Sequence, residues 1–341
     1  MAVGGKGTKM RRRTLLKTGL GAAALAALSG CSSGTGGGQK ILRLEINQTE
    51  KHPSYIALKS FGDSFEKATD GEYRFDIFAN EMLGAQQEIL NLQRNGIVDL
   101  AIISSTQLEN INRNFRVFNM PSVFSSVDHQ MRVINDEKIS GELFNSLVAT
   151  NNLKVLGGFT QGERNLYTKK AVSSPAELSG MKIRVQESPV MLRMVEAMGG
   201  NPAPMAYGEV YTALQAGVLD GAENNEVSYQ TQKHFEVAPH YVYTRHLVGL
   251  DYMVASNESL TKMRPEIREK FDAEWTKCWQ YFVQLWSEAS EKAIEQAKAG
   301  GAQFHEIDNS EFAQRLGPLA ESLLDGDVQR RIYQLTKEAD R

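Results

Sequence analysis

The residues best suited to bind a charged small molecule lie within the segment 181–225. Residues 182–185, KIRV, alternate like a short strand, so Arg184 points away from its two apolar neighbours near the strand's end. Ser188 follows as a helix N-cap, and Pro189 takes the first helical position. Ligands of open α/β sheets gather outside the carboxyl ends of strands, where helix N-termini offer unpaired N–H groups to anions. An arginine at this place suits a carboxylate ligand, and the alternative is a surface strand residue paired with Glu187.

The same joint between a helix and a strand occurs twice in the chain. Residues 88–101 align without gaps with residues 209–222, at a constant offset of 121 positions. In both copies a helix ends at a glycine, where a positive φ costs little, and an apolar strand follows. Two lobes with an equivalent αβ unit explain this match, and chance similarity between two stereotyped joints is the alternative. Asp99 and Asp220 occupy the same place in the two copies, and we expect them to serve in turns or in packing.

Strands alternate with helices in the first part of the chain, which indicates an α/β protein with mainly parallel sheets. The strand patterns cover residues 41–47, 73–78 and 98–103, and the helical patterns begin at Pro53 and Gln86. Asn47 ends the first of these strands, and Ser105 follows the third. Polar side chains therefore accumulate where the strands end.

A helical pattern of 34 residues runs without interruption from Pro265 to Lys298, which corresponds to about 50 Å. Its large apolar side chains recur at helical spacing on one stripe: Trp275, Trp279, Phe282 and Trp286. Such a stripe is more often core than a ligand site, so we expect it to be buried. Cys278 lies on the same helix, and we expect it to be a small buried apolar side chain.

Charge and composition argue against several classes of protein. The first 30 residues hold six of the 38 basic residues and none of the 41 acidic ones, so residues 31–341 carry a net charge of −9. This balance disfavours nucleic-acid binding, and local arginines must attract any anionic ligand. The sequence has no HExxH motif, no close-set histidine pair and only two cysteines, Cys31 and Cys278. We expect no metal, no cofactor and no enzymatic activity; the alternative is a secreted hydrolase or lyase of sugar acids.

The N-terminal segment indicates export and a lipid anchor. Residues 12–17, RRTLLK, resemble a twin-arginine signal, and the apolar run 20–28 is too short to cross a bilayer. Residues 28–31, LSGC, resemble a lipobox, which marks cleavage before Cys31 and lipidation of its thiol. An apolar N-terminus that stays attached is the alternative. The resulting expectation is a signal peptide over residues 1–30, a flexible tether over residues 31–40, and a periplasmic or cell-surface lipoprotein.

Three segments resemble the solute receptors of tripartite ATP-independent periplasmic (TRAP) transporters: KIRV, PMAYGEVYTALQAGVLDGAEN, and LGAQQEI followed by NGIVDLAI. The resemblance runs from Ile41 through the long C-terminal helix. It implies a two-lobed, Venus-flytrap binding protein that closes on a small organic acid and delivers it to a membrane permease. It also implies that Arg184, the arginine of KIRV, forms the main salt bridge to the ligand. By position, Arg164, Asn224 and Tyr207 match further binding residues of that family.

The two lobes follow from the same resemblance, which implies that the long helix spans both. We expect lobe I to comprise residues 41–161 and 250–289, and lobe II to comprise residues 162–249 and 290–341. Asn47, Gln86 and Ser105 are expected to reach the ligand from lobe I, so that both lobes contact it only when the cleft closes. We expect the receptor to be a monomer.

The class of ligand is indicated by two further segments. Residues 223–225, ENN, and residues 244–246, TRH, with Asp251 resemble the branch of the family that takes hexuronates such as glucuronate and galacturonate. A pocket that adds Asn225 and His246 to the other polar residues offers donors and acceptors for sugar hydroxyls. The alternatives are a receptor for C4-dicarboxylates or other sugar acids, and a sensor that hands its closed state to a signalling receptor.

Overall fold

The computed structural model describes residues 38–340 of the chain. The expected signal peptide, most of the expected tether and Cys31 therefore lie outside the described residues. Across residues 38–340, every helix is too short or too polar to cross a membrane.

The first half of the fold is a three-stranded parallel sheet with a crossover helix after each of the first two strands. Its elements are β1 (Lys40–Ile46), α1 (Pro53–Ala68), β2 (Tyr73–Phe78), α2 (Gln86–Arg94) and β3 (Leu100–Ser104). β1 lies between β2 and β3 and pairs in parallel with both. The first helix begins as the sequence indicates, because His52 accepts a hydrogen bond from the Ser54 backbone N–H and Pro53 occupies the first turn.

The second half repeats this order of elements. They are β5 (Lys182–Val185), α7 (Pro189–Met198), β6 (Asn201–Pro204), α8 (Val210–Gln215) and β7 (Gly221–Asn224), with β5 paired in parallel to β6 and β7. Asp99 accepts a hydrogen bond from the Arg43 backbone N–H at 2.8 Å, and Asp220 accepts one from the Lys182 backbone N–H at 2.8 Å. The repeated joint in the sequence is therefore a real structural repeat, and both aspartates tie a turn to the neighbouring strand, as expected.

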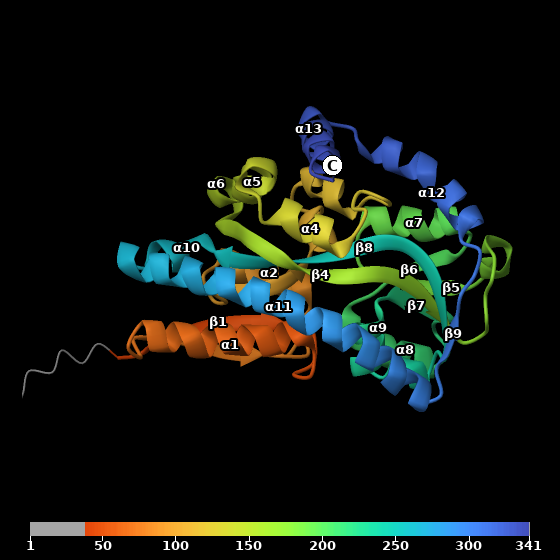
Figure 1. Ribbon diagram of the computed structural model, residues 1–341, viewed down its shortest axis with the longest axis horizontal. Helices are drawn as coiled ribbons and strands as arrows, with labels where there is room; N and C mark the ends of the chain where they lie inside the picture. Colours follow the sequence, from red (N-terminus) through yellow and green to blue (C-terminus); the bar gives the residue numbers. More distant parts are fainter. Residues whose placement is uncertain (1–37, 341) are drawn as a thin grey trace, which may run out of the picture. The chain divides into compact units, whose positions relative to one another are not determined.

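Two long strands join the halves into one sheet. β4 (Leu153–Thr168) and β8 (His240–Ser256) pair with each other in antiparallel orientation, and Figure 1 shows them running side by side. Within residues 38–340 the strand order is β2-β1-β3-β8-β4-β7-β5-β6, with β9 (Gln303–His305) paired to β8. Five of the strand pairings in this part of the chain are parallel and three are antiparallel. The sequence analysis expected the parallel pairs but not the antiparallel strands between them.

Helices cover both faces of the sheet. On β3 and β8, Ile102 and Met253 belong to the apolar cluster beneath α1 and α11 (Pro265–Ala299), whereas Ile103 and Tyr252 face the opposite cluster. This alternation follows from the period of two along a strand. The opposite cluster lies on the face of the sheet that α2 covers. Between β3 and β4 the chain forms the further elements α3 (Ser105–Leu108), η1 (Arg113–Asn119), α4 (Val127–Ile134), α5 (Glu137–Asn145) and α6 (Val148–Asn151).

The 35-residue helix α11 packs on α1 of the first half and on α9 (Glu226–Thr231) of the second. Trp275, Phe282 and Trp286 are buried and Trp279 is half-buried. This confirms that the stripe is core. Cys278 is also buried on this helix, with its thiol 3.5 Å from the Ala57 carbonyl oxygen.

One of the remaining elements, the short 3-10 helix Tyr207–Glu209, lies within the second repeat, and the others lie outside the two repeats. The remaining elements are η2 (Pro175–Leu178), η3 (Tyr207–Glu209), η4 (His234–Glu236), α10 (Asn257–Thr261), α12 (Ser310–Leu323) and α13 (Asp327–Glu338). The last two helices pack on different halves: α12 packs on α7 of the second half, whereas α13 packs on η1 and α5. The C-terminal segment therefore contacts both halves.

The close approach of the paired strands β4 and β8 depends on a glycine. A Cβ atom at Gly158 would lie 2.1 Å from the backbone oxygen of Asp251. We expect Gly158→Ala to force these two strands apart and to lower the free energy of unfolding by about 3 kcal/mol. Urea unfolding followed by circular dichroism measures the change. In the control Gly326→Ala, at the N-cap of α13, the added methyl group meets no atom closer than 3.6 Å, so stability should change by less than about 1 kcal/mol. Equal stability of both variants would contradict the prediction.

Candidate functional site

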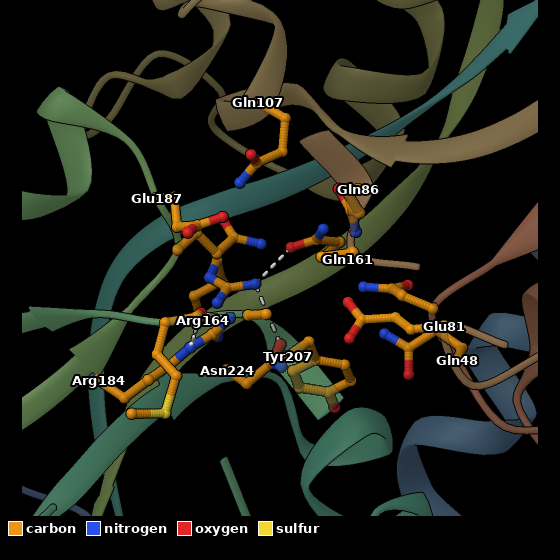
Figure 2. A pocket seen from close by; sticks show the side chains of 15 residues that line it. Gln48, Glu81, Gln86, Gln107, Gln161, Arg164, Arg184, Glu187, Tyr207 and Asn224 are labelled. Carbon is orange, nitrogen blue, oxygen red and sulfur yellow. Dashed lines mark hydrogen bonds between the residues drawn. The ribbon is translucent and has the colours of Figure 1, made fainter. Parts of the chain in front are cut away.

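A polar pocket lies where the residues after β1 and the start of α2 face the second half of β4 and the carboxyl ends of β5 and β7 (Figure 2). The space between its side chains amounts to about 420 Å³, including its opening to solvent. Its lining residues are Asn47, Gln48, Glu81, Ala85, Gln86, Gln107, Gln161, Arg164, Arg184, Gln186, Glu187, Met205, Ala206, Tyr207 and Asn224.

Arg184 enters this pocket from β5, as the alternation of KIRV predicts. Ile183 and Val185 are fully buried in the core on the other face of the strand. The Arg184 guanidinium donates to the Met205 backbone oxygen from Nε at 2.9 Å and from Nη2 at 2.7 Å, and it lies 5.6 Å from the Tyr207 ring centre. Within the described part of the chain, no carboxylate lies within 4.0 Å of it. Burial lowers the pKa of Arg184, so an anion beside it would stabilise its charged form.

The orientation of Arg184 limits how it can hold a ligand. Nε and the adjacent N–H of Nη2 point at one carbonyl oxygen, that of Met205. Because the guanidinium is planar, Nη1 and the second N–H of Nη2 point away from that carbonyl as a parallel pair. This end of the group has the geometry for two hydrogen bonds to a single carboxylate.

The second arginine of the pocket, Arg164, is already neutralised within the protein. Its Nε and Nη2 donate to the two carboxylate oxygens of Glu223 at 2.5 and 2.6 Å, and both side chains are almost completely buried. The pairing of β4 with β7 sets this contact. Leu166 lies opposite Glu223 in the register, and Arg164 precedes Leu166 by two residues, which is the period of one face of a strand. Burial alone would raise the pKa of Glu223, but Arg164 and His246 outweigh it and hold the pKa at about 2.

Neutral groups complete the surroundings of this ion pair. Arg164 Nη1 donates to Asn224 Oδ1 at 3.0 Å and also to Gln161 Oε1. Gln161 in turn donates to Asp251 at 2.5 Å, and burial raises the pKa of Asp251 to about 6. His246 Nε2 lies 3.5 Å from Glu223 on the side away from the pocket. These contacts fix the orientation of the Asn224 and Gln161 side chains in the pocket lining.

The family model of bacterial extracellular solute-binding proteins, family 7, matches residues 45–326. The chain belongs to this family. It is a TRAP solute-binding protein, and the two-lobed periplasmic binding fold expected from the sequence is confirmed. Its role is that of an extracytoplasmic receptor, which implies a TRAP membrane permease as its partner.

Two solved structures resemble this TRAP receptor over most of their length. A TRAP periplasmic solute-binding protein of Anaerococcus prevotii with bound glucuronate is 32% identical, with a TM-score of 0.85 over 89% of this chain and 98% of that chain. One from Xanthobacter autotrophicus with bound galacturonate is 27% identical, with a TM-score of 0.82 over 87% of this chain and 99% of that chain. The C4-dicarboxylate-binding periplasmic protein of Vibrio cholerae is 30% identical over 66% of this chain and 68% of its own length.

The structure brings six of the nine expected ligand residues of the receptor to one pocket: Arg184, Arg164, Asn224, Asn47, Tyr207 and Gln86. The other three lie outside its lining. Ser105 donates its hydroxyl to the Asn119 side chain. Asn225 caps α9 by accepting from the Ser228 backbone N–H at 2.8 Å, and His246 lies behind Glu223. All three are buried residues that support neighbours of the pocket.

The sequence analysis missed several polar residues of the lining: Gln48, Glu81, Gln107, Gln161, Gln186 and Glu187. Gln186 follows Arg184 by two residues, directly after the end of β5, so the period of two continued by one residue was a signal for it. Gln161 precedes Arg164 in a bulged part of β4, where the register shifts and the simple alternation fails. Glu81 lies in the connection between β2 and α2, and no periodicity identifies such a position.

The buried ion pair makes stability depend on Glu223. Replacing it with alanine leaves the Arg164 cation buried without its partner, which should lower the free energy of unfolding by about 3–5 kcal/mol near neutral pH. The folded pKa of Glu223, about 2, lies below its ordinary value of 4.5. Its stabilisation is therefore fully present above the ordinary value and is lost as the pH falls toward 2.

Urea unfolding of wild type and Glu223→Ala at about pH 7 and about pH 3 measures this effect, and the difference between the proteins should shrink at the lower pH. The control is Glu306→Ala, which removes an exposed partner 3.0 Å from Arg245 and should cost less than about 1 kcal/mol. If the Glu223 variant matches wild type near neutral pH, the ion pair is not a stabilising contact.

Proposed function

We propose that this receptor binds a hexuronate such as glucuronate or galacturonate, with Arg184 as the anchor for the carboxylate. The observation that supports this proposal most strongly is the environment of Arg184, a residue that is 3% exposed. Its guanidinium lies beside a carbonyl and an aromatic ring and has no carboxylate partner among the described residues. A buried cation needs a compensating charge, and a carboxylate matches the shape of the guanidinium end. The site therefore favours a ligand that brings its own anion.

The rest of the pocket lining suits the hydroxyl groups of a sugar. Seven side chains of the lining are neutral amides, which both donate and accept hydrogen bonds: Asn47, Gln48, Gln86, Gln107, Gln161, Gln186 and Asn224. The structures from Anaerococcus prevotii and Xanthobacter autotrophicus that resemble this chain contain glucuronate and galacturonate. These two observations together support a hydroxylated acid over an apolar one.

The relative from Vibrio cholerae makes a C4-dicarboxylate the second candidate. A second carboxylate would need a second cation. Arg164 is the other arginine of the described pocket, and Glu223 already neutralises it with two hydrogen bonds. This pairing favours a single carboxylate on the ligand.

A sensor that reports its closed state to a signalling receptor would bind the same ligand, and membrane pull-down distinguishes it from a transport receptor.

We propose that ligand binding closes two lobes with the boundaries expected from the sequence, residues 41–161 with 250–289 and residues 162–249 with 290–341. β4 and β8 pass from one to the other, and β4 contains a bulge near Gly162, whose φ is +62°. α11 contacts both lobes. The contacts of α13 with η1 and α5 attach the end of the chain to lobe I as well. In this proposal the receptor acts as a monomer and performs no chemistry on its ligand.

A ligand panel tests the function directly. Isothermal titration calorimetry of the purified receptor with glucuronate, galacturonate and succinate should give a dissociation constant near micromolar, about −8 kcal/mol, for at least one uronate. Succinate should bind far more weakly, because it leaves the pocket amides without partners. Tight succinate binding together with no uronate heat would overturn the assignment and favour the dicarboxylate receptor.

The same titrations test the anchor. Arg184→Ala should weaken uronate binding by about 3 kcal/mol or more, on the scale of breaking a buried charge pair. Arg184→Lys should also fail, because one ammonium group cannot hold the Met205 carbonyl and a carboxylate in the same way. The control Lys182→Ala removes an exposed positive charge from the same strand and should leave the affinity unchanged. Wild-type affinity in Arg184→Lys would show that the planar fork is not what binds the ligand.

We further propose that residues 1–30 direct export by a twin-arginine type of pathway and that lipidated Cys31 anchors the receptor to a membrane. Cys31→Ser should abolish lipidation, so the protein should appear as soluble exported receptor or as uncleaved precursor. Membrane fractionation and intact-mass measurement detect both products. Wild-type protein that stays in the cytoplasm with residues 1–30 attached would contradict the proposal.

A further inference from the structure

The two sides of the pocket carry opposite charges. β4 and β5 contribute the arginines 164 and 184, whereas the side built from β1 and the connection after β2 contributes Glu81. Glu45 lies on β1, two residues before Asn47 of the lining, and is completely buried. Within residues 38–340, neither of these two glutamates has a lysine, arginine or histidine within 4.0 Å. Glu81 is therefore the carboxylate of the lobe I lining, and among the described residues no cation pairs with it.

Glu81 is held with its carboxylate in the pocket. Its backbone has a φ of +54°, next to Asn80 at +58°, so the chain turns sharply between β2 and α2. Oε2 accepts a hydrogen bond from the Gly208 backbone N–H of the other lobe at 2.9 Å. Figure 2 shows Glu81 and Arg184 on opposite sides of the pocket, with Tyr207 and Asn224 between them. A ligand whose carboxylate meets Arg184 directs its other end toward Glu81.

This acidic side also has an excess of hydrogen-bond acceptors. Asn47 Oδ1 and Gln48 Oε1 are buried and receive no hydrogen bond in the described part of the chain. Both oxygens of Glu45 also lack a hydrogen bond, but burial together with Glu81 raises the pKa of Glu45 to about 8, so this carboxyl group is mostly protonated near neutral pH and does not add a negative charge. Burial also raises the pKa of Glu81, against the opposing effects of the Gly208 N–H and of Arg184. Unsatisfied acceptors require donors, and hydroxyl groups are donors, whereas a carboxylate is not.

We propose that Glu81 selects the far end of the ligand: it accepts hydrogen bonds from sugar hydroxyls and repels a second carboxylate. The proposal rests on the proposed function and makes it narrower. The receptor takes acids with one carboxylate and several hydroxyls, and it rejects aldaric acids, which carry a carboxylate at both ends. Two like charges placed together in a buried site disfavour the wrong ligand strongly, so one acidic side chain suffices for this discrimination.

Calorimetry with galacturonate and galactarate tests the selection, because galactarate carries a second carboxylate at the far end. Wild type should bind galacturonate at least about tenfold more tightly than galactarate. Glu81→Gln keeps an oxygen for the Gly208 N–H but removes the charge. In this variant the ratio of the two dissociation constants should shift by at least about tenfold toward galactarate. Glu81→Asp, which keeps the charge, should retain the wild-type preference.

The matched control is Glu209→Gln, which removes a negative charge from an exposed residue beside Gly208, outside the pocket lining. Its ratio should equal that of wild type. Equal affinity of wild type for galacturonate and galactarate, or an unchanged ratio in a folded Glu81→Gln protein, overturns the role of Glu81. Wild type that binds neither galacturonate nor glucuronate overturns the proposed function instead, so the two failures are distinguishable. Thermal unfolding of each variant verifies folding. If a variant does not fold, the wild-type ratio for galactonate and galactarate, two open-chain acids that differ only in the far carboxylate, decides the proposal: equal affinities overturn it.

Discussion

The buried ion pair between Arg164 and Glu223 is the interaction on which the rest of the site depends. Two charges withdrawn from water are tolerated only when their geometry is nearly ideal and their remaining hydrogen bonds are filled. Here the pairing of β4 with β7 supplies that geometry, and Asn224, Gln161 and His246 fill the remaining positions. Because these partners cannot move without exposing a buried charge, the floor of the pocket is rigid before any ligand arrives.

This arrangement explains why two arginines in one pocket do different work. Arg164 donates hydrogen bonds from both edges of its guanidinium to groups of the protein, so its charge orients the side chains of the lining. Arg184 donates from one edge of its guanidinium to the Met205 carbonyl, and its other edge can donate to a ligand. The positive potential available to a ligand is therefore confined to one side of the pocket, while Glu81 makes the other side negative. A ligand must match this polarity, which fixes its direction as well as its charge.

Local patterns in the sequence were sufficient for the repeated βαβ units, because their pairing is set by nearby alternation and by glycines at helix ends. The same local logic identified Arg184 and the core stripe of α11. It did not identify β4 and β8, whose pairing joins residues far apart in the chain and is interrupted by bulges. Ser105 and Asn225 were expected in the pocket, yet Ser105 donates to the Asn119 side chain and Asn225 caps α9. Glu81 enters from the connection after β2 and Gln107 from the four-residue helix α3, and both segments are too short to show a periodic pattern.

The position of β8 has a consequence for how the receptor is made. β3 pairs with β1 on one edge, and its other edge is completed only when residues 251–255 arrive as part of β8. During synthesis the whole second βαβ unit must emerge before that edge is covered. A strand edge that stays open in this way is a template for pairing between chains. The sheet around β3 is therefore completed only after the second βαβ unit has been synthesised, and until then the open edge of β3 is a place where two chains can pair.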